Sequence, residues 1–268
     1  MATVVDRPAP PTGHRARIRS PKREPALLRI GAACAILGTV ANVVTSAAHG
    51  DLPNSSTQAG LGFVAARDSW SLVHLGTIVG VLLWVGALVA LAGSVDHEPG
   101  RSLARLATAS AVVGAAVHVV FFSIDGVALK GAADAWAAAP PSERAGPLQT
   151  AEAVLLLQRS QFHSAIAFFL GLPFVLFGLA VVFDRTYPAW IGWIGVVAGA
   201  GALVTGTTRF VGLDLVPDEL LFGGFGLPLG LWMIATGALM WRRAGDTGDH
   251  GTGIGTVGPT VANIIGGA

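Results

Sequence analysis

Long apolar runs separated by short polar stretches dominate the chain. Six windows of about 20 residues carry almost no charged side chains, and each is long enough to cross a hydrocarbon layer of about 30 Å at about 1.5 Å per residue. They run Leu27–Ala48, Leu72–Val95, Leu103–Ile124, Phe162–Phe183, Trp190–Val211 and Leu220–Trp241. Backbone groups in lipid must be paired within their own segment, so each window predicts a helix. The pattern therefore predicts an all-α membrane protein, a bundle of six transmembrane helices.

Composition supports this fold class. Of the 268 residues, 52% are hydrophobic and only 12% are charged, whereas a soluble domain carries about 25% charged residues. The expected partner is therefore the lipid bilayer. A net charge of +1 gives no indication of a nucleic-acid partner. The single cysteine, Cys34, excludes a disulfide framework and a Cys-x-x-Cys motif within the chain.

The distribution of basic residues predicts the orientation. Arginine and lysine favour the cytoplasmic side of a membrane. If the Arg-rich stretch before residue 30 lies in the cytoplasm, the same side gains Arg101, Arg105, Arg185, Arg242 and Arg243. Both termini are therefore predicted to be cytoplasmic. The abundance of Arg, Ala, Gly and Val over Lys resembles GC-rich bacteria, so we expect a multi-pass protein of the bacterial plasma (inner) membrane.

The chain divides into a membrane domain and two tails. Residues 1–26 are rich in Pro and Arg, residues 244–268 are rich in Gly and Thr, and both are predicted to be disordered. Residues 27–243 form the six-helix domain. An alternative for the first helix is a cleavable signal peptide ending near Ala48. The larger loops, Gly50–Ser71 and Asp125–Gln161, are expected outside, the second with a short helix broken at Pro140 and restarting at Thr150.

Polar side chains collect in the predicted outer halves of the helices. An ionisable residue in an apolar helix usually faces the bundle interior or a water-filled cavity. His118 and Asp125 lie seven residues apart on one face of the third helix, about 10 Å along its axis. We therefore predict an outward-facing polar cavity, with His74, His118 and His163 as candidate metal ligands. The other predicted lining residues are Asn42, His49, Thr77, Asp125, Thr205 and Arg209.

The histidines also have a simpler interpretation. His49, His74 and His163 lie near the membrane boundary, where amphipathic side chains are tolerated. No His-x-x-x-His or His-Glu-x-x-His spacing demands a metal. Haem or a transition metal remains the cofactor to test, although an electron conduit would need histidine pairs at both faces.

Small residues predict close helix packing. Gly76-x-x-x-Gly80, Gly195-x-x-x-Gly199 and Gly226-x-x-x-Gly230 allow helices to approach within the chain or, alternatively, in a homo-oligomer. Two "GLP" motifs, which end at Pro173 and Pro228, predict kinks.

The six-helix plan, the long first outer loop and the stretch "YPAWIGWIGVVAGAGALVTG" resemble a family of bacterial integral membrane proteins catalogued only as a domain of unknown function. The resemblance covers about Leu27 to Trp241. The chain has Pro-Ala-Trp where we associate Pro-Arg-Trp with the family. The resemblance implies the fold and no activity.

Three function classes therefore remain open. The first is a membrane protein without chemistry of its own, such as a scaffold, and hence no enzyme. The second is a permease or sensor for a small solute that uses the outward cavity. The third is a membrane redox or metal protein. Bound metal or a haem absorption band would separate the third from the other two.

Overall fold

A computed structural model describes residues 25–53, 55–217 and 220–246, and over these residues the regular structure is entirely helical. Three spans contain single long α-helices, namely α1 (Pro25–His49), α3 (Trp70–Ser94) and α8 (Ala189–Phe210). A short helix, α2 (Thr57–Ala65), lies between α1 and α3.

The remaining spans each contain a π-helical turn (η). The third is α4 (Gly100–Ser123), η1 (Ile124–Leu129) and α5 (Lys130–Ala138). The fourth, which follows the 3₁₀ turn η2 (Pro141–Glu143), is α6 (Ala145–Ala165), η3 (Ile166–Gly171) and α7 (Leu172–Asp184). The sixth is η4 (Leu220–Gly226) and α9 (Leu227–Asp246).

The predicted membrane bundle is confirmed. Six helices are long and apolar enough to cross a bilayer. Large apolar side chains such as Val43, Leu82, Val113 and Val197 lie in the middle of these helices and are about half or more exposed. In water this surface would be costly, whereas lipid chains solvate it. The fold therefore belongs in a membrane.

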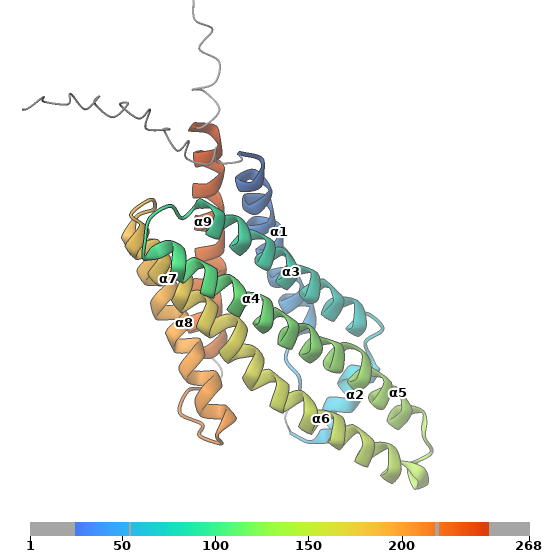
Figure 1. The fold of residues 1–268 in the computed structure, drawn as a ribbon. Coiled ribbons are helices and arrows are strands. Elements are labelled where there is room, and N and C mark those ends of the chain that lie inside the picture. The colour runs from blue at the N-terminus through green and yellow to red at the C-terminus, as the bar shows by residue number, and fades with distance from the viewer. Residues whose placement is uncertain (1–24, 54, 218–219, 247–268) are drawn as a thin grey trace, which may run out of the picture.

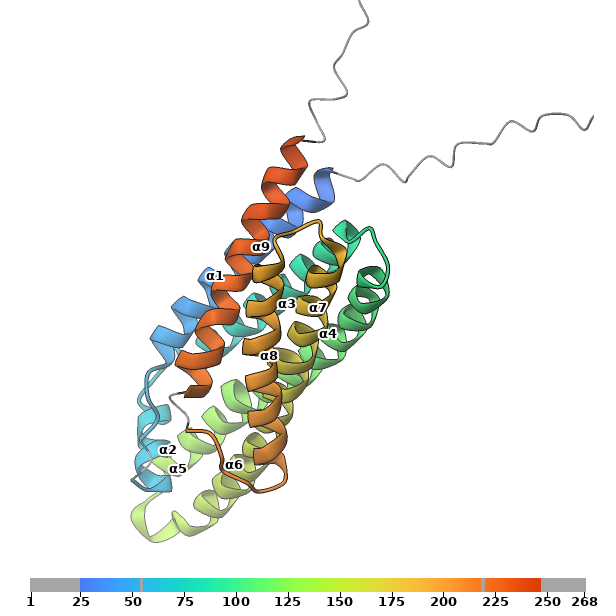
Figure 2. The ribbon, with the colours of Figure 1, turned by 90° about the vertical axis from the view of Figure 1, so that its left-hand side faces the viewer.

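The packing order of the helices places the start of α1 and the end of α9 at the same end of the bundle. α1 lies against α3 and α9, α4 against α3 and α7, and α8 against α7. Figures 1 and 2 show that α1 begins and α9 ends at the same end of the bundle, which we call the tail end; the opposite end is the cap end. Which end faces the cytoplasm stays a prediction. Most of each predicted disordered tail lies outside the described residues, although Pro25 and Asp246 are helical.

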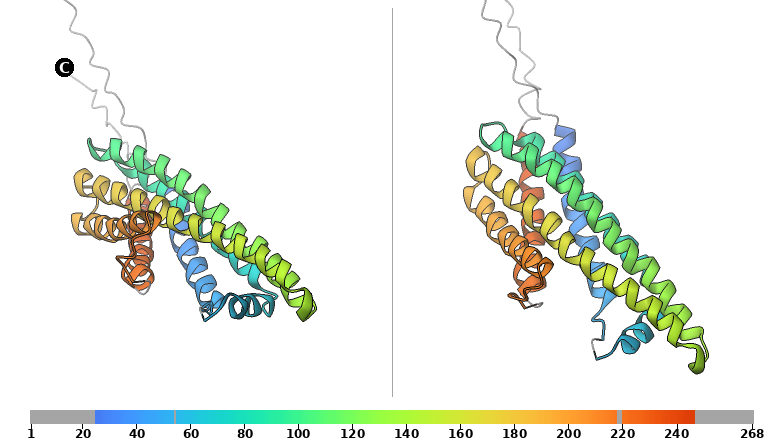
Figure 3. Two further views of the ribbon diagram at one scale, coloured as in Figure 1. Left: turned by 90° about the horizontal axis from the view of Figure 1, so that it is seen from below. Right: turned by 60° about the horizontal axis from the view of Figure 1, so that its bottom comes forward.

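The third and fourth spans form a hairpin much longer than a bilayer is thick. They run 39 and 40 residues, which corresponds to about 60 Å of helix against about 30 Å of hydrocarbon. The hairpin therefore extends beyond the other helices at the cap end (Figure 3). The turn follows Pro140 as predicted, but the helix restarts at Ala145, and Thr150 lies inside it and donates to the carbonyl of Gly146.

The extension carries a small core of its own. The cap comprises α2, α5 and the first half of α6, through Leu155. Its buried residues are Leu61, Val64, Ala132, Ala133 and Ala151, and Trp70 of α3 and Leu129 of η1 join the same cluster. The main bundle has a separate core around Trp84, Phe169, Phe174, Phe177 and Trp232. The bundle and the cap thus meet near Trp70, the first residue of α3.

A π turn precedes each of the two prolines in the "GLP" motifs. η3 ends at Gly171, two residues before Pro173, and η4 ends at Gly226, two residues before Pro228. Proline lacks an N–H donor and its ring clashes with the carbonyl four residues earlier, so a widened turn relieves the clash. The motifs therefore alter the helices as local widenings of the backbone.

The glycine pairs contact other helices of the same chain. A Cβ on Gly76 or Gly80 would collide with Thr45 or Asn42 of α1, and one on Gly199 would collide with α7. These glycines therefore serve packing within the protein. A homo-oligomer stays a prediction.

Candidate metal centre

His74 is the centre of a buried polar cluster at the cap end. It lies in the second turn of α3 and is 1% exposed. Its Nδ1 is 2.7 Å from the carbonyl oxygen of Trp70. Because a carbonyl can only accept, Nδ1 carries the proton, and in the neutral ring Nε2 holds a lone pair. That Nε2 lies 3.2 Å from Oδ2 of Asp125.

Asp125 lies in the π turn η1, where the third span passes from the bundle into the cap. The residue is 4% exposed, and its Oδ1 has no hydrogen-bond partner among the described residues. Side chains of α3 hold this backbone in place, since Trp70 Nε1 donates to the Asp125 carbonyl (3.0 Å) and Ser71 Oγ to the Gly126 carbonyl (2.6 Å). A Cβ on Gly126 would be 2.5 Å from Cβ of His74. Glycine at 126 therefore allows the carboxylate and the imidazole to meet.

His49 completes the cluster as the last residue of α1. Its Nδ1 is 2.7 Å from the carbonyl oxygen of Gly50, so Nδ1 is again the donor and Nε2 is left with a lone pair. The ring centroid lies 4.5 Å from Trp70 and 5.2 Å from His74. Arg67 donates to the backbone carbonyl of His49. The imidazole is thus held by the Gly50 carbonyl and by the tryptophan, and Arg67 holds the backbone of His49.

One ligand atom from each of His49, His74 and Asp125 lies within 4.8 Å of the others. Two ligands about 2.1 Å from a tetrahedral ion lie about 3.4 Å apart, so small side-chain rotations would close the set around an ion. Metal-ligating histidines usually donate their other ring N–H to a carbonyl or carboxylate. Both imidazoles here already do so. Two imidazoles and one carboxylate form a donor set suited to a divalent transition metal.

The contact between His74 and Asp125 needs a positive species to be stable. A neutral Nε2 and a carboxylate oxygen are both acceptors, and neither makes a hydrogen bond across their 3.2 Å separation. Leaving a polar group buried and unpaired costs about 1–3 kcal/mol. A proton or a metal ion would remove this cost. Only a metal ion would also bind the third candidate ligand, His49.

The other predicted metal ligands lie elsewhere. His118 faces an aromatic pocket, with Phe122 and Phe169 each 5.0 Å from it between ring centroids, and its Nδ1 has no partner among the described residues. Phe122 also contacts His74, at 5.8 Å, and so lies beside both histidines. His163 is half-buried on α6 beside Phe162. The metal-capable group found in the described residues is therefore His49, His74 and Asp125.

The remaining predicted lining residues divide between two places. Thr77 lies one turn from His74 and donates to Thr45 of α1 (2.9 Å), and Asn42 lies deeper, against Gly80. Thr205 and Arg209 lie on α8, where Thr205 donates to the Gly201 carbonyl and Arg209 to the Val216 carbonyl. One cavity shared by all of these residues stays a prediction.

His49 was predicted to line the same cavity as His74, but not to be a metal ligand. His49 ends one helix and His74 begins the next long one. Consecutive antiparallel helices bring these positions to the same end of a bundle, so the two residues could have been paired. Nothing local in the sequence indicates that the carboxylate of a different helix joins them.

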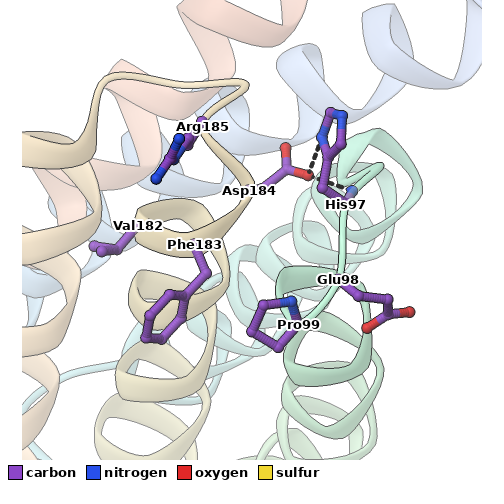
Figure 4. A pocket seen from close by; sticks show the side chains of 7 residues that line it. All are labelled: His97, Glu98, Pro99, Val182, Phe183, Asp184 and Arg185. Atoms are coloured by element: carbon purple, nitrogen blue, oxygen red, sulfur yellow. Dashed lines mark hydrogen bonds and ion pairs between the residues drawn. The ribbon is translucent and has the colours of Figure 1, made fainter.

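A second polar cluster lies at the tail end, and its contacts differ. Asp184 is the last residue of α7, and its Oδ1 accepts from the backbone N–H groups of Asp96 (2.8 Å) and His97 (2.7 Å). A surface pocket of about 690 Å³ adjoins it, lined by His97, Glu98, Pro99, Val182, Phe183, Asp184 and Arg185 (Figure 4). Figure 4 shows the carboxylate turned towards the α3–α4 loop. The contacts of Asp184 therefore hold that loop in place.

Comparison with known proteins supports the membrane domain. A family model described as Domain of unknown function (DUF4386) matches residues 26–237. No curated protein and no solved structure matches the chain.

Proposed function

The chain belongs to the family described as Domain of unknown function (DUF4386), and from the geometry of its own residues we propose that this multi-pass membrane protein binds a divalent transition metal ion at the cap end. The ligands are His49, His74 and Asp125. The observation that carries the proposal is the pair of imidazoles whose Nδ1–H groups are both used by backbone carbonyls, beside a buried carboxylate with an unpaired oxygen. The donor set fits zinc, iron, nickel or copper.

Orientation and location are part of the proposal. The excess of Lys and Arg at the tail end supports a cytoplasmic tail end and an outward-facing metal site in a bacterial plasma membrane. A metal ion would then reach the site from outside the cell. In this arrangement the protein takes up or senses metal.

The packing around His74 favours an ion over haem. Its ring has Trp70 at 4.8 Å, His49 at 5.2 Å and Phe122 at 5.8 Å between centroids. A haem would need a flat slot beside the ligating nitrogen, and these three rings occupy the surrounding space. A single ion needs no such slot.

Zinc binding to the purified full-length protein tests the proposal. The protein, carrying a tag without histidine, is stripped with EDTA and titrated with Zn²⁺ in competition with a fluorescent chelator. We expect one ion per chain. The His74→Ala variant should lose at least about 100-fold in affinity, because removing even a supporting partner of a metal ligand typically costs 10–100-fold.

His118→Leu is the matched control, since it removes a buried histidine from the same end of the bundle. Its affinity for Zn²⁺ should equal that of the wild type. Equal affinity of wild type and His74→Ala would refute the proposed site. A loss in His118→Leu as large as that in His74→Ala would move the site to the aromatic pocket.

A further inference from the structure

The three ligands lie at three of the four places where the chain passes between the bundle and the cap; the fourth is within α6. His49 ends α1 just before the loop to α2, and His74 follows the point where α2 connects back to α3. Asp125 lies in η1, between α4 in the bundle and α5 in the cap. An ion bound to all three would therefore join three of the four chain crossings at one point.

Trp70 connects the ligands to the core of the cap. Its side chain is fully buried and belongs to the same apolar cluster as Leu61 and Val64 of α2. The ring also lies 4.5 Å from His49 and 4.8 Å from His74 between centroids. A shift of the imidazoles is thus transmitted to the packing of α2.

Few other polar contacts hold α2 in place. Ser56 accepts a hydrogen bond from the N–H of Ala59 at the start of the helix, and Lys130 donates to the Ala65 carbonyl at its end (3.3 Å). Arg67, just after the helix, donates to the carbonyl of His49 and lies over the ring of Phe63. The described residues of this segment, 50–53 and 55–67, therefore depend on one apolar cluster, on Lys130 and, through Arg67, on the position of His49.

We propose that metal occupancy fastens the cap to the bundle, so that the cap end becomes more ordered when the ion binds. This inference rests on the proposed metal site and adds its consequence. Without the ion, Nε2 of His74 and the carboxylate of Asp125 are compatible at 3.2 Å only when a proton lies between them, and His49 takes no part in that contact. With the ion, both become ligands and draw α1, α3 and η1 together. The protein would thus report external metal through the conformation of its cap.

Hydrogen–deuterium exchange of the full chain in detergent, with EDTA or saturating Zn²⁺, tests the coupling. Exchange reports local opening, and a small loosely held unit opens more readily than a core. We expect Zn²⁺ to slow exchange by about tenfold or more in peptides covering 50–66 and 130–144, because 1.4 kcal/mol of protection corresponds to a factor of ten. Peptides covering 95–101 at the tail end should not change.

The outcomes separate the coupling from the site itself. If the competition titration shows Zn²⁺ bound to the wild type while exchange in the cap is unchanged, the coupling is refuted and the metal site stands. If no Zn²⁺ binds, the site is refuted together with the coupling. In His74→Ala, slowing of the cap by Zn²⁺ would also contradict the coupling.

Variants in the cap provide a second test, because coupling is reciprocal. Val64→Ala removes buried apolar volume from the cap core without changing a metal ligand and should loosen the cap. The apparent dissociation constant for Zn²⁺ rises as the closed fraction of the cap falls, so Zn²⁺ binding should weaken once exchange shows the cap open for most of the time without the ion. Normal Zn²⁺ affinity in a variant whose cap is mostly open without Zn²⁺ would overturn the proposal.

Arg67→Ala sharpens the result, with Arg101→Ala as its match at the tail end. Each arginine donates to a backbone carbonyl next to a turn, that of His49 and that of Asp96 respectively. Arg67→Ala should weaken Zn²⁺ binding by about tenfold, as loss of a ligand-orienting partner does, and speed exchange of α2. Arg101→Ala should do neither, and equal effects of the two substitutions would count against the proposal.

Discussion

Each end of the bundle buries a carboxylate, but the groups that face the two carboxylates differ. At the tail end, Oδ1 of Asp184 receives two backbone N–H donors and lies 3.2 Å from Nδ1 of His97. At the cap end, Oδ2 of Asp125 faces the lone-pair nitrogen of His74. The first carboxylate is compensated by the protein itself and closes a loop. The second needs either a proton on His74 or a bound cation.

The comparison shows how a buried carboxylate that stabilises the fold differs from one that can bind an ion. Each carboxylate keeps one oxygen without a partner among the described residues, so the count of unpaired atoms does not separate them. The two carboxylates differ in the groups that face their other oxygen. Donors opposite a carboxylate complete a fold, whereas acceptors opposite it leave a place for an ion.

The largest effect is expected at the tail end. Asp184→Ala leaves the N–H groups of Asp96 and His97 without their acceptor, and hydrogen bonds to a charged group contribute about 1.5–3 kcal/mol each. The free energy of unfolding should fall by about 3 kcal/mol, with or without Zn²⁺, as thermal unfolding in detergent would show. Asp134→Ala, which removes a half-exposed carboxylate paired with Lys130, is the control and should change little. A metal-dependent loss in Asp184→Ala would break the comparison.

Zinc itself should stabilise the protein by nearly as much. A ligand that binds only the folded state at 100 times its dissociation constant contributes about 2.7 kcal/mol. The thermal midpoint of the wild type should therefore rise with Zn²⁺ and fall back with EDTA. Asp184→Ala should show the same rise, and His74→Ala none. Equal rises in all three proteins would mean that the ion binds elsewhere.

Asp125→Asn is expected to have a smaller effect, and one of opposite sign to Asp184→Ala. The new amide can donate to Nε2 of His74 and removes a buried charge, so the metal-free protein should gain about 1 kcal/mol. The same substitution should abolish stabilisation by Zn²⁺. Thermal unfolding in EDTA measures the first effect. Destabilisation in EDTA as large as that of Asp184→Ala would show that Asp125 is already paired and structural.

The smallest effect is expected at His118. Its Nδ1 has no partner among the described residues, and its ring packs against Phe122 and Phe169. Leucine fills similar volume and needs no hydrogen bond, so His118→Leu should change the free energy of unfolding by less than about 1 kcal/mol, towards greater stability. A loss above about 2 kcal/mol in the same thermal unfolding assay would show that the hydrogen bond of this side chain with the Ala165 backbone outweighs its unpaired Nδ1.

Hydropathy was sufficient for the bundle because lipid imposes one rule on every span. A run such as Trp190–Val211 must be helical wherever it packs, and the structure has α8 at Ala189–Phe210. The cap was less predictable. Its helices are only weakly apolar, and their extension beyond the membrane depends on the packing of α2 against α5, which no periodicity indicates.

The sequence predicted at which end of the helices the candidate site lies, but not which residues form it. Apolar surroundings indicated that His74, His118 and Asp125 need partners, and all three lie towards the cap end. The partners depend on helix rotation and on the close approach at Gly126, which brings Asp125 to His74, while His118 packs against Phe169 of η3. Both depend on tertiary packing, which cannot be inferred from residue spacing along one helix.

X-ray absorption at the zinc edge tests the central claim most directly, because it counts the ligands of the bound ion. The wild-type protein with one Zn²⁺ should show two imidazole nitrogens and oxygen donors at about 2.0–2.2 Å. His49→Ala should reduce the imidazole count to one, and His118→Leu should leave it at two. A spectrum without imidazole scattering, or one that His49→Ala leaves unchanged, would contradict a metal centre built from His49, His74 and Asp125.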